Sequence, residues 1–191
     1  AIHLQKNWGV SYARNRGIEQ AKGSLVCFLD SDDLWEIGKL AAQVKWMQSH
    51  PECQAVYTDE IWIRNGVRVN PMKKHQKFGG MIFNECLDIC RISPSSSLFC
   101  RALLDDVGWF DETLPICEDY DLWLRVTSQY EVFYIDFSTT LHRIGKGFEY
   151  LHFRQQVKER LLQLNISPLR HFSHEELAEY TSFPDADAHV T

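Results

Sequence analysis

The stretch Leu25-Val26-Cys27-Phe28-Leu29-Asp30-Ser31-Asp32-Asp33 decides the fold, because an apolar run ends there in clustered carboxylates. Gly23-Ser24 interrupts the preceding segment, and the continuous apolar run then predicts a strand that is covered on both faces of an α/β sheet. Ligands of such sheets bind at the carboxyl ends of the strands, which is where these aspartates lie. The sequence therefore predicts a ligand site directly after Leu29.

The acidic end of this stretch is suited to a divalent metal. Asp30 and Asp32 stand two positions apart, so an extended backbone would point both carboxylates to the same side. Hard oxygen ligands favour Mn²⁺ or Mg²⁺, which keep coordination positions for water and for a substrate phosphate. The alternative is a turn followed by a helix cap, since Asp and Ser favour both roles, and we assign the capping role to Asp33.

Outside this stretch, the apolar spacing alternates between helical and extended periods. The predicted helices are Ser11 to Ala21, capped by Ser11, the segment with Leu40, Val44 and Met47 up to His50-Pro51, Phe83 to Cys90, Arg101 to Val107, and Glu118 to Gln129. The predicted strands are Ala55 to Thr58, Ile61 to Arg64, Val67 to Val69, Ser96 to Cys100, Val132 to Ile135, and Thr139 to His142. Asn65-Gly66 is typical of a hairpin turn, and the basic stretch Lys73 to Lys77 predicts a solvated, mobile loop.

Two further blocks of sequence carry a family resemblance. The first runs from Asn7 to Ile18 and leads into the strand and its D-x-D motif. The second comprises Val107 to Glu112 and then Glu118 to Arg125. In order and spacing these blocks resemble the nucleotide-sugar glycosyltransferases of the large inverting family two, in which N-x-G-x-x-x-A-R-N opens a helix before the metal motif. The resemblance spans about residues 5 to 145.

The resemblance implies a GT-A fold, which is a Rossmann-like α/β domain with a mixed central sheet and flanking helices. We expect this catalytic domain over residues 1–147 and a helical extension over residues 148–191, with helices at Phe148 to Leu164 and Glu175 to Tyr180 and a frayed tail at Phe183 to Thr191. The family's opening strands and helix, which grip the base and ribose, have no counterpart before Ala1. We therefore expect an N-terminally truncated member, and both an active enzyme and an inactive fragment remain open.

The resemblance also implies a donor site. Asp30, Ser31 and Asp32 would bind the nucleotide sugar, and Asp30 and Asp32 would hold Mn²⁺ or Mg²⁺ at its diphosphate. Arg14 matches an arginine that lines the nucleotide site, although an ordinary helix salt bridge explains it equally well. His142 stands near the place where the family carries a metal-reaching histidine, and it is the third candidate metal ligand. The alternative for His142 is a satisfied residue at a strand edge.

The second block implies the catalytic base. Inversion by direct displacement needs one carboxylate to take the proton of the acceptor hydroxyl, and the resemblance assigns this role to Asp119. Glu118 is the catalytic neighbour that tunes the base or binds the acceptor. The alternative is that both carboxylates only stabilise the N-terminus of the following helix through its dipole. Asp121 and Arg125 are expected to form an ordinary helix pair worth a few tenths of a kcal/mol, roughly.

Composition limits the partners. The net charge of −6 and the pI near 5.7 argue against a nucleic-acid partner, which would want a basic face. No apolar run approaches the roughly twenty residues of a membrane span. The cysteines fit buried, reduced thiols of a cytosolic protein.

The expected function is transfer of a sugar from a nucleoside diphosphate donor, UDP above others, to a saccharide or lipid-linked acceptor. The expected location is cytoplasmic, with the inner face of the membrane as an option. Two alternatives stay open: a degenerate, non-catalytic domain that binds a glycan or a partner, and a Mg²⁺-dependent phosphatase of the haloacid-dehalogenase type with Asp30 as nucleophile. That phosphatase motif wants Thr or Val where this chain has Leu34.

Overall fold

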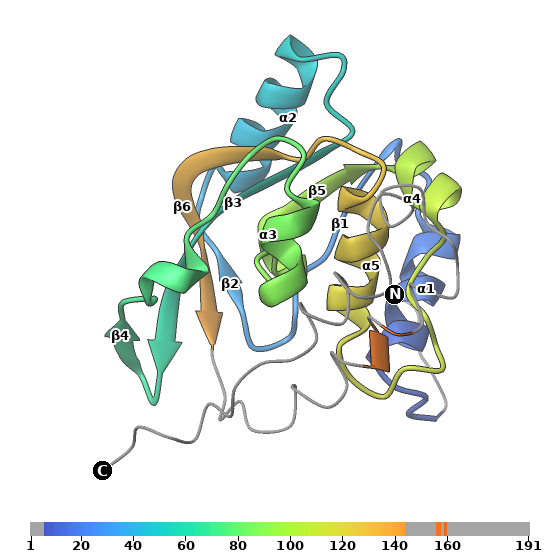
Figure 1. Cartoon of the computed structure of the whole chain (residues 1–191), viewed down its shortest axis with the longest axis horizontal. Helices are drawn as coiled ribbons and strands as arrows, with labels where there is room; N and C mark the ends of the chain where they lie inside the picture. Colours follow the sequence, from blue (N-terminus) through green and yellow to red (C-terminus); the bar gives the residue numbers. More distant parts are fainter. Residues whose placement is uncertain (1–5, 144–155, 158, 160–191) are drawn as a thin grey trace.

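The computed structural model describes residues 6–143, 156, 157 and 159 (Figure 1). The helices are α1 (Val10–Gln20), α2 (Lys39–Ser49), α3 (Phe83–Asp88), α4 (Arg101–Val107) and α5 (Glu118–Thr127), with the 3-10 turns η1 (Lys73–His75) and η2 (Pro94–Ser96). The strands are β1 (Leu25–Cys27), β2 (Leu34–Trp35), β3 (Ala55–Arg64), β4 (Val67–Val69), β5 (Ser97–Cys100) and β6 (Phe133–Arg143).

The strands form one mixed sheet in the order β1-β5-β3-β6-β2, with β4 paired to β3. β3 and β6 run parallel, whereas the other pairs run antiparallel. Because β1 and β5 are antiparallel, the carboxyl end of β1 lies beside η2, which leads into β5. The predicted fold class, a mixed central sheet with flanking helices, is confirmed.

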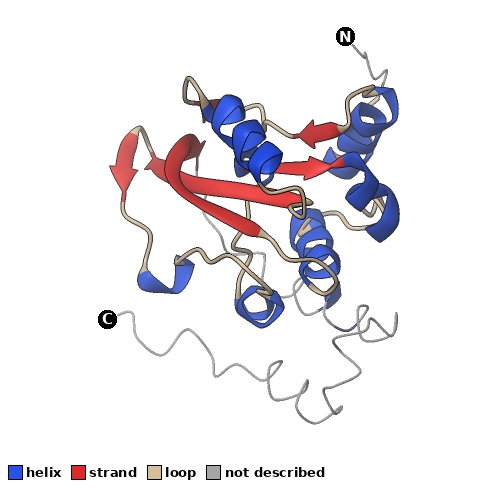
Figure 2. Ribbon diagram, turned by 90° about the horizontal axis from the view of Figure 1, so that it is seen from above, coloured by secondary structure: helices blue, strands red, loops and turns tan. Residues whose placement is uncertain are grey.

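The sheet separates two apolar layers, and alternation along each strand decides which layer a side chain joins. On one face, α2 contributes Met47 to a small cluster with Val56 and Leu98. On the other face, α1, α3, α4 and α5 enclose the larger core, in which Trp123 stacks on Phe99 with ring centroids 5.1 Å apart. Figure 2 shows α2 on one side of the sheet and α3 and α5 on the other.

Two helix caps that the sequence predicted are wrong. α1 begins after Gly9, which has a φ of 90°, and Ser11 is buried inside the helix. Asp33 does not cap α2, because the chain first forms β2 and the helix then begins after Gly38, with a φ of 95°. In both places glycine allows a positive φ that other residues rarely adopt, and the backbone turns into the helix there without a side-chain cap.

The strands differ in length from the prediction. β1 ends at Cys27, and Leu29, which was expected to be covered, has 48% of its surface exposed. β3 and β6 are each continuous where two separate strands were predicted, and their register shifts on both sides of Asp59. The predicted hairpin is confirmed, since Asn65 and Gly66 have φ values of 50° and 77° and join β3 to β4.

Lys77 does not belong to a solvated loop, contrary to the prediction from its basic neighbours. Its ammonium donates to Glu60 Oε1 at 2.7 Å, and the two side chains are only 7% and 3% exposed. Ser93 Oγ and Trp62 Nε1 donate to the same carboxylate at 2.6 Å and 3.0 Å. Burial alone would raise the pKa of Glu60, but Lys77 and the nearby His142 lower it to about 2. This buried charge is therefore held by several partners at once.

The predicted C-terminal extension, residues 148–191, lies mostly outside the described residues. Val157, within the predicted helix Phe148 to Leu164, is helical and buried against the larger core. The predicted helix Glu175 to Tyr180 and the predicted tail Phe183 to Thr191 lie outside the described residues altogether. The boundary between the two domains stays a prediction.

Replacing Lys77 by Met should lower the free energy of unfolding by about 3–5 kcal/mol, because Glu60 would keep a buried charge without its cation. Urea denaturation at pH 7 measures this loss.

The pKa of Glu60 falls from 4.5 to about 2 on folding, so its ionisation stabilises the fold above about pH 4.5. That stabilisation is lost as the pH falls toward 2, and Glu60→Gln should flatten the acid part of the stability profile.

The matched control is Lys73→Met, which removes an exposed charge from the same basic stretch. It should change the free energy of unfolding by less than about 0.5 kcal/mol. Equal losses in the two variants would contradict a stabilising role for the Lys77–Glu60 ion pair.

Candidate active site

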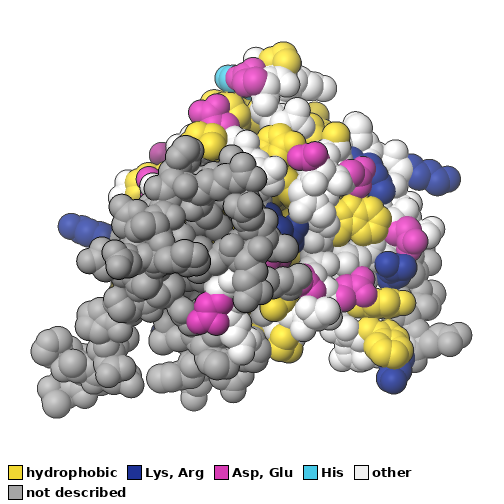
Figure 3. Space-filling model, turned by 45° about the vertical axis from the view of Figure 1, so that its right-hand side comes forward, with side chains coloured by type: hydrophobic (Ala, Val, Ile, Leu, Met, Phe, Trp, Pro, Cys, Tyr) yellow, Lys and Arg dark blue, Asp and Glu magenta, His cyan; other side chains and the backbone are white. Residues whose placement is uncertain are grey.

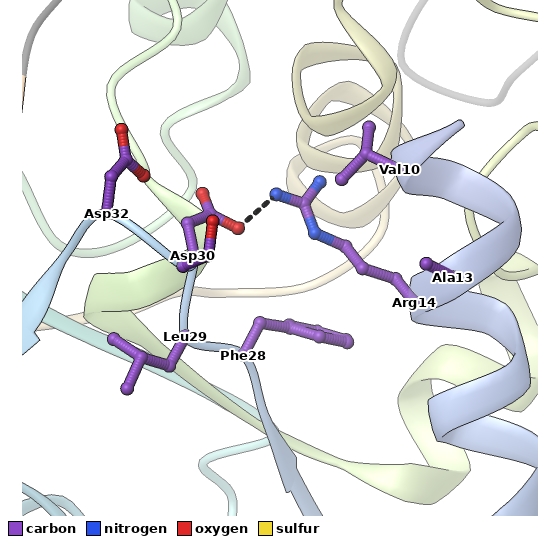
Figure 4. A pocket seen from close by; sticks show the side chains of 8 residues that line it. Val10, Ala13, Arg14, Phe28, Leu29, Asp30 and Asp32 are labelled. Carbon is purple, nitrogen blue, oxygen red and sulfur yellow. Dashed lines mark hydrogen bonds and ion pairs between the residues drawn. The ribbon is translucent and has the colours of Figure 1, made fainter. Parts of the chain in front are cut away.

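A pocket of about 480 Å³ opens between α1 and the loop that follows β1 (Figure 4). The lining residues in the described part of the chain come from these two segments: Val10, Ala13, Arg14, Phe28, Leu29, Asp30, Ser31 and Asp32. The structure thus brings together the four residues that the resemblance assigned to the nucleotide sugar. The candidate catalytic carboxylates Glu118 and Asp119 are not among the described lining residues, but Glu118 lies next to the pocket because it accepts from Arg14.

Arg14 joins the two halves of the site. Its Nη2 donates to Asp30 Oδ1 and its Nη1 donates to Glu118 Oε1, both at 2.6 Å. The Arg14 side chain is only 10% exposed, and its guanidinium carbon lies 5.1 Å from the centroid of the Phe110 ring. Burial lowers the pKa of Arg14, but the two carboxylates more than offset this and raise it above its usual value. The alternative of an ordinary helix salt bridge is therefore wrong, because neither carboxylate belongs to α1.

Asn15, the next residue of the family pattern, fixes α1 in place. Its Nδ2 donates to the Phe110 carbonyl at 2.8 Å, and its Oδ1 accepts from the Phe110 N–H at 3.0 Å. The side chain also donates to Glu112 Oε1 at 2.9 Å. The buried side-chain amide of Asn15 thus pairs both the N–H and the C=O of Phe110, which belongs to the second sequence block of the family resemblance. Asn15 was not among the predicted site residues, although its place in the family pattern was the available signal.

The loop after β1 holds its two aspartates differently. The backbone N–H of Asp30 donates to Ser95 Oγ at 3.0 Å, which ties the loop to η2. Figure 4 shows the carboxylate of Asp30 turned toward Arg14, and Asp32 farther along the loop. Ser31 and Asp32 are both exposed. Asp32 is therefore the aspartate of the motif that an incoming ion reaches from solvent.

The donor set suits a hard divalent ion only in part. In the described part of the chain, no cluster of three or more His, Cys, Asp or Glu side chains could hold a metal. Asp30 already shares its charge with Arg14, so Asp32 is the main protein ligand that this loop offers. Mg²⁺ and Mn²⁺ accept such sites when water and substrate phosphates complete the shell. The residues present thus fit a metal that arrives together with a diphosphate.

His142, the third candidate metal ligand, does not line the pocket. Its Nδ1 lies 3.1 Å from Oδ2 of Asp33, which is itself buried behind the loop. Burial lowers the pKa of His142, but the hydrogen bond to Asp33 and the charge of Glu60 outweigh it and raise the pKa. The structure therefore pairs the half-buried His142 of β6 with Asp33, and in the described residues it does not complete a metal site with Asp30 and Asp32.

Asp119, the candidate base, stands in the first turn of α5. Its Oδ1 accepts from the Tyr120 N–H at 2.7 Å, and its Oδ2 lies 3.5 Å from the thiol of Cys90. Burial, and after it the charge of Glu118, raises the pKa of Asp119 to about 6. A carboxylate with a pKa near the working pH is suited to general base catalysis. Glu118 itself is 8% exposed and is bound to Arg14.

Asp121 and Arg125 form the expected pair four residues apart on one helix, but the pair is buried rather than on the surface. The Asp121 side chain is 2% exposed and accepts from Arg125 Nε at 3.0 Å and Nη2 at 2.7 Å. The same guanidinium donates to the carbonyls of Val107, Gly108 and Trp109 at 2.6, 2.7 and 2.8 Å. Arg125 therefore fixes the start of the segment that joins α4 to α5.

The surface around the site carries mixed charge. Figure 3 shows acidic, basic and apolar side chains interspersed on one face of the molecule. Arg14 lies between two carboxylates, so its positive charge is largely matched locally. Among the described residues, no helix is both long and apolar enough to cross a bilayer.

Asn15→Ala should lower the free energy of unfolding by about 2–4 kcal/mol, because it leaves the N–H and C=O of Phe110 buried without their partners. Urea denaturation measures the change. Gln20→Ala, at the exposed end of the same helix, is the control and should change stability by less than about 0.5 kcal/mol. A loss below 1 kcal/mol, roughly, in Asn15→Ala would mean that water replaces the amide without strain.

The comparison with known proteins gives the family. The sequence profile of the Glycosyltransferase like family 2 matches residues 2–162. An uncharacterized glycosyltransferase of Bacillus subtilis (strain 168) is 28% identical over 135 residues, which cover 69% of this chain and 49% of that protein. The UDP-Glc:alpha-D-GlcNAc-diphosphoundecaprenol beta-1,3-glucosyltransferase WfaP of Escherichia coli is 30% identical over 135 residues, which cover 67% of this chain and 49% of the relative. The chain spans about half the length of these relatives.

Solved structures give the fold. S. aureus TarS 1-349 in complex with UDP-GlcNAc matches with a TM-score of 0.67 at 18% identity, over 93% of this chain and 52% of that one. The mannosyltransferase PcManGT from Pyrobaculum calidifontis, in complex with GDP-Man and Mn2+, matches with a TM-score of 0.52 at 18% identity, over 94% of this chain and 50% of that one. With the profile match over most of the sequence, these findings show that this chain belongs to glycosyltransferase-like family 2 and has the GT-A fold.

Proposed function

We propose that this chain carries the donor site and the catalytic base of a glycosyltransferase that moves a sugar from a nucleoside diphosphate to a hydroxyl acceptor, with inversion. The observation that carries the proposal is the contact of Arg14 with both Asp30 and Glu118 at 2.6 Å. This contact joins the D-x-D loop, which suits a diphosphate, to the turn that carries Asp119. The proposed donor loop and the turn that carries the proposed base thus contact the same guanidinium.

In the proposed reaction, Asp119 takes the proton of the acceptor hydroxyl as its oxygen attacks the anomeric carbon. The bond to the nucleoside diphosphate breaks on the opposite face of the sugar, which inverts the configuration. The pKa of Asp119, about 6, leaves the carboxylate ionised at neutral pH while it remains a stronger base than an exposed aspartate. Glu118 contributes by its charge, which is one cause of that raised pKa.

Charge develops on the leaving diphosphate, and the donor loop is where it would be stabilised. Arg14 is the cation that the chain supplies there, and Asp32 is the exposed carboxylate that would hold Mn²⁺ or Mg²⁺. When bound, such an ion would act as a Lewis acid on the diphosphate oxygens. The neighbouring PcManGT structure holds GDP-Man and Mn2+, which supports metal dependence for this chain.

The names and titles of the relatives support one class of donor and one class of acceptor. The Escherichia coli relative is named as a transferase from UDP-Glc to a diphosphoundecaprenol-linked sugar, and TarS was solved with UDP-GlcNAc. We therefore propose a UDP-sugar donor and a saccharide or lipid-linked acceptor. A cytoplasmic location at the inner face of the membrane, where a lipid-linked acceptor is within reach, belongs to the same proposal.

Calorimetric titration of the protein with UDP should show binding that requires Mn²⁺ and is lost in Asp32→Ala. The physical reason is that two negative groups, the diphosphate and Asp32, need the ion between them. Asp88→Ala, which removes an exposed carboxylate at the end of α3, is the control and should bind UDP like the wild type. Metal-independent binding, or full binding by Asp32→Ala, would remove Asp32 from the metal site. GDP tested in parallel reports the choice of base.

Asp119→Asn should reduce the transfer rate by about 10²–10⁴-fold and leave the dissociation constant for UDP unchanged, because the amide cannot accept the proton. Transfer is measured as release of UDP in the presence of acceptor. In the wild type, the rate should fall with decreasing pH through about 6, as the carboxylate becomes protonated. Wild-type activity in Asp119→Asn would exclude it as the base, and metal-dependent UDP binding without any transfer would favour a non-catalytic binding domain.

A further inference from the structure

The junction between α3 and α5 brings a thiol to the candidate base. Cys90 follows α3 by two residues, and α3 packs against α5 in the larger core. The hydroxyl of Tyr120, the residue after Asp119, donates to the carbonyl of Leu87 at 2.7 Å. This bond ties the first turn of α5 to the last turn of α3. The position of the Cys90 thiol relative to Asp119 is therefore fixed by the core and not by a loose loop.

The two oxygens of Asp119 face two different donors. Oδ1 accepts from the backbone N–H of Tyr120 at 2.7 Å, which sets the position of one oxygen. Oδ2 lies 3.5 Å from Cys90 Sγ, within the range of a thiol hydrogen bond. The same sulfur lies 3.5 Å from the carbonyl of Ile92. Because a thiol has one proton, Cys90 can donate either to the carboxylate or to this carbonyl at a given moment.

We propose that Cys90 is a positioning residue for the Asp119 carboxylate: its thiol donates to Oδ2 and fixes the plane of the carboxylate about the bond to Oδ1. With one donor on each oxygen, the side chain cannot turn freely about its terminal torsion, which is otherwise soft for aspartate. The lone pairs of Oδ2 then keep one direction. A base must be held in such a direction if it is to take a proton from a bound hydroxyl.

Among the described residues, the charged groups that act on Asp119 are Glu118 and Arg14, and these two are bound to each other. Glu118, on the same turn, is bound to Arg14 of α1, and Arg14 also holds Asp30. Glu118 repels a negative charge on Asp119 and Arg14 attracts it, whereas Cys90 is the neutral donor from the α3 side. Glu118 and Arg14 thus act on the pKa of Asp119 in opposite directions. A substitution at Cys90 leaves both ion pairs in place, so a shift of this pKa in a Cys90 variant reports the loss of the thiol.

A thiol suits this place because it is a weak donor. A hydroxyl in the same position would hold the carboxylate more strongly and make its negative form more stable, at the cost of its basicity. A methyl group would leave Oδ2 without this donor and make the negative form less stable. Cys90 thus fixes the orientation of the base and lowers its affinity for the proton only slightly.

The test is a direct titration of Asp119 in the purified protein, followed by the NMR shift of its side-chain carboxyl carbon and assigned with Asp119→Asn. Cys90→Ala should raise the midpoint by about half a pH unit, and Cys90→Ser should leave it at the wild-type value or lower it. The control is Cys86→Ala, in α3 itself, whose thiol hydrogen-bonds to Thr127; it removes the same type of side chain and should leave the midpoint in place. An unchanged midpoint in Cys90→Ala, or equal shifts in Cys90→Ala and Cys86→Ala, would overturn the proposal.

This inference rests on the proposed function only in that it takes Asp119 to be the base. A second measurement distinguishes a failure of the Cys90 role from a failure of that assignment. The pH profile of kcat/KM for transfer should move in Cys90→Ala by the same amount and in the same direction as the NMR midpoint, and Cys90→Ser should restore it. If the NMR midpoint moves while the rate profile does not, Cys90 still acts on Asp119 and the assignment of Asp119 as base fails. If neither moves, the role of Cys90 fails whatever the base is.

Discussion

The contact of one guanidinium with two carboxylates organises this site. Arg14 lies 16 residues from Asp30 and 104 residues from Glu118 along the chain, yet it donates to both at the same distance. Two carboxylates brought this close would repel each other in a partly buried place, and the cation between them removes that repulsion. The position of α1 is thereby fixed against both the loop after β1 and the first turn of α5. Every proposed chemical role in this chain depends on that arrangement.

Around this centre, backbone groups are held by side chains rather than by regular secondary structure. Asn15 pairs both backbone groups of Phe110, and Arg125 takes up three successive carbonyls from Val107 to Trp109. Ser95 receives the N–H of Asp30 on the other side. Loops with buried backbone groups need such partners, because an unpaired buried donor or acceptor is costly. The loops of the site are therefore held in place by side-chain hydrogen bonds to their backbone.

Much of this could be predicted from the sequence, and the limits have physical causes. The positions of the helices and of most strands followed from apolar periodicity, although β2 was missed and β3 and β6 were each divided in two. The grouping of Arg14 with Asp30 followed from the family pattern. The cap at Asp33 and the solvated loop around Lys77 were wrong, because each residue has its partner far away in sequence, in His142 and Glu60. Local composition cannot report a partner that only the folded sheet supplies. Asn15 was overlooked for the same reason.

The distance along the chain between the parts of the site also bears on how the site forms. The hairpin at Asn65 and Gly66 closes a short loop. The contact of Arg14 with Glu118 closes a loop of about a hundred residues, which costs more chain entropy. This contact is made only when the sheet and both helices are in place. Contacts of such long range slow folding. A nucleotide that needs this contact would bind the complete fold and no partly folded state, so the concentration of its own ligand would set how much of the chain remains folded in the cell.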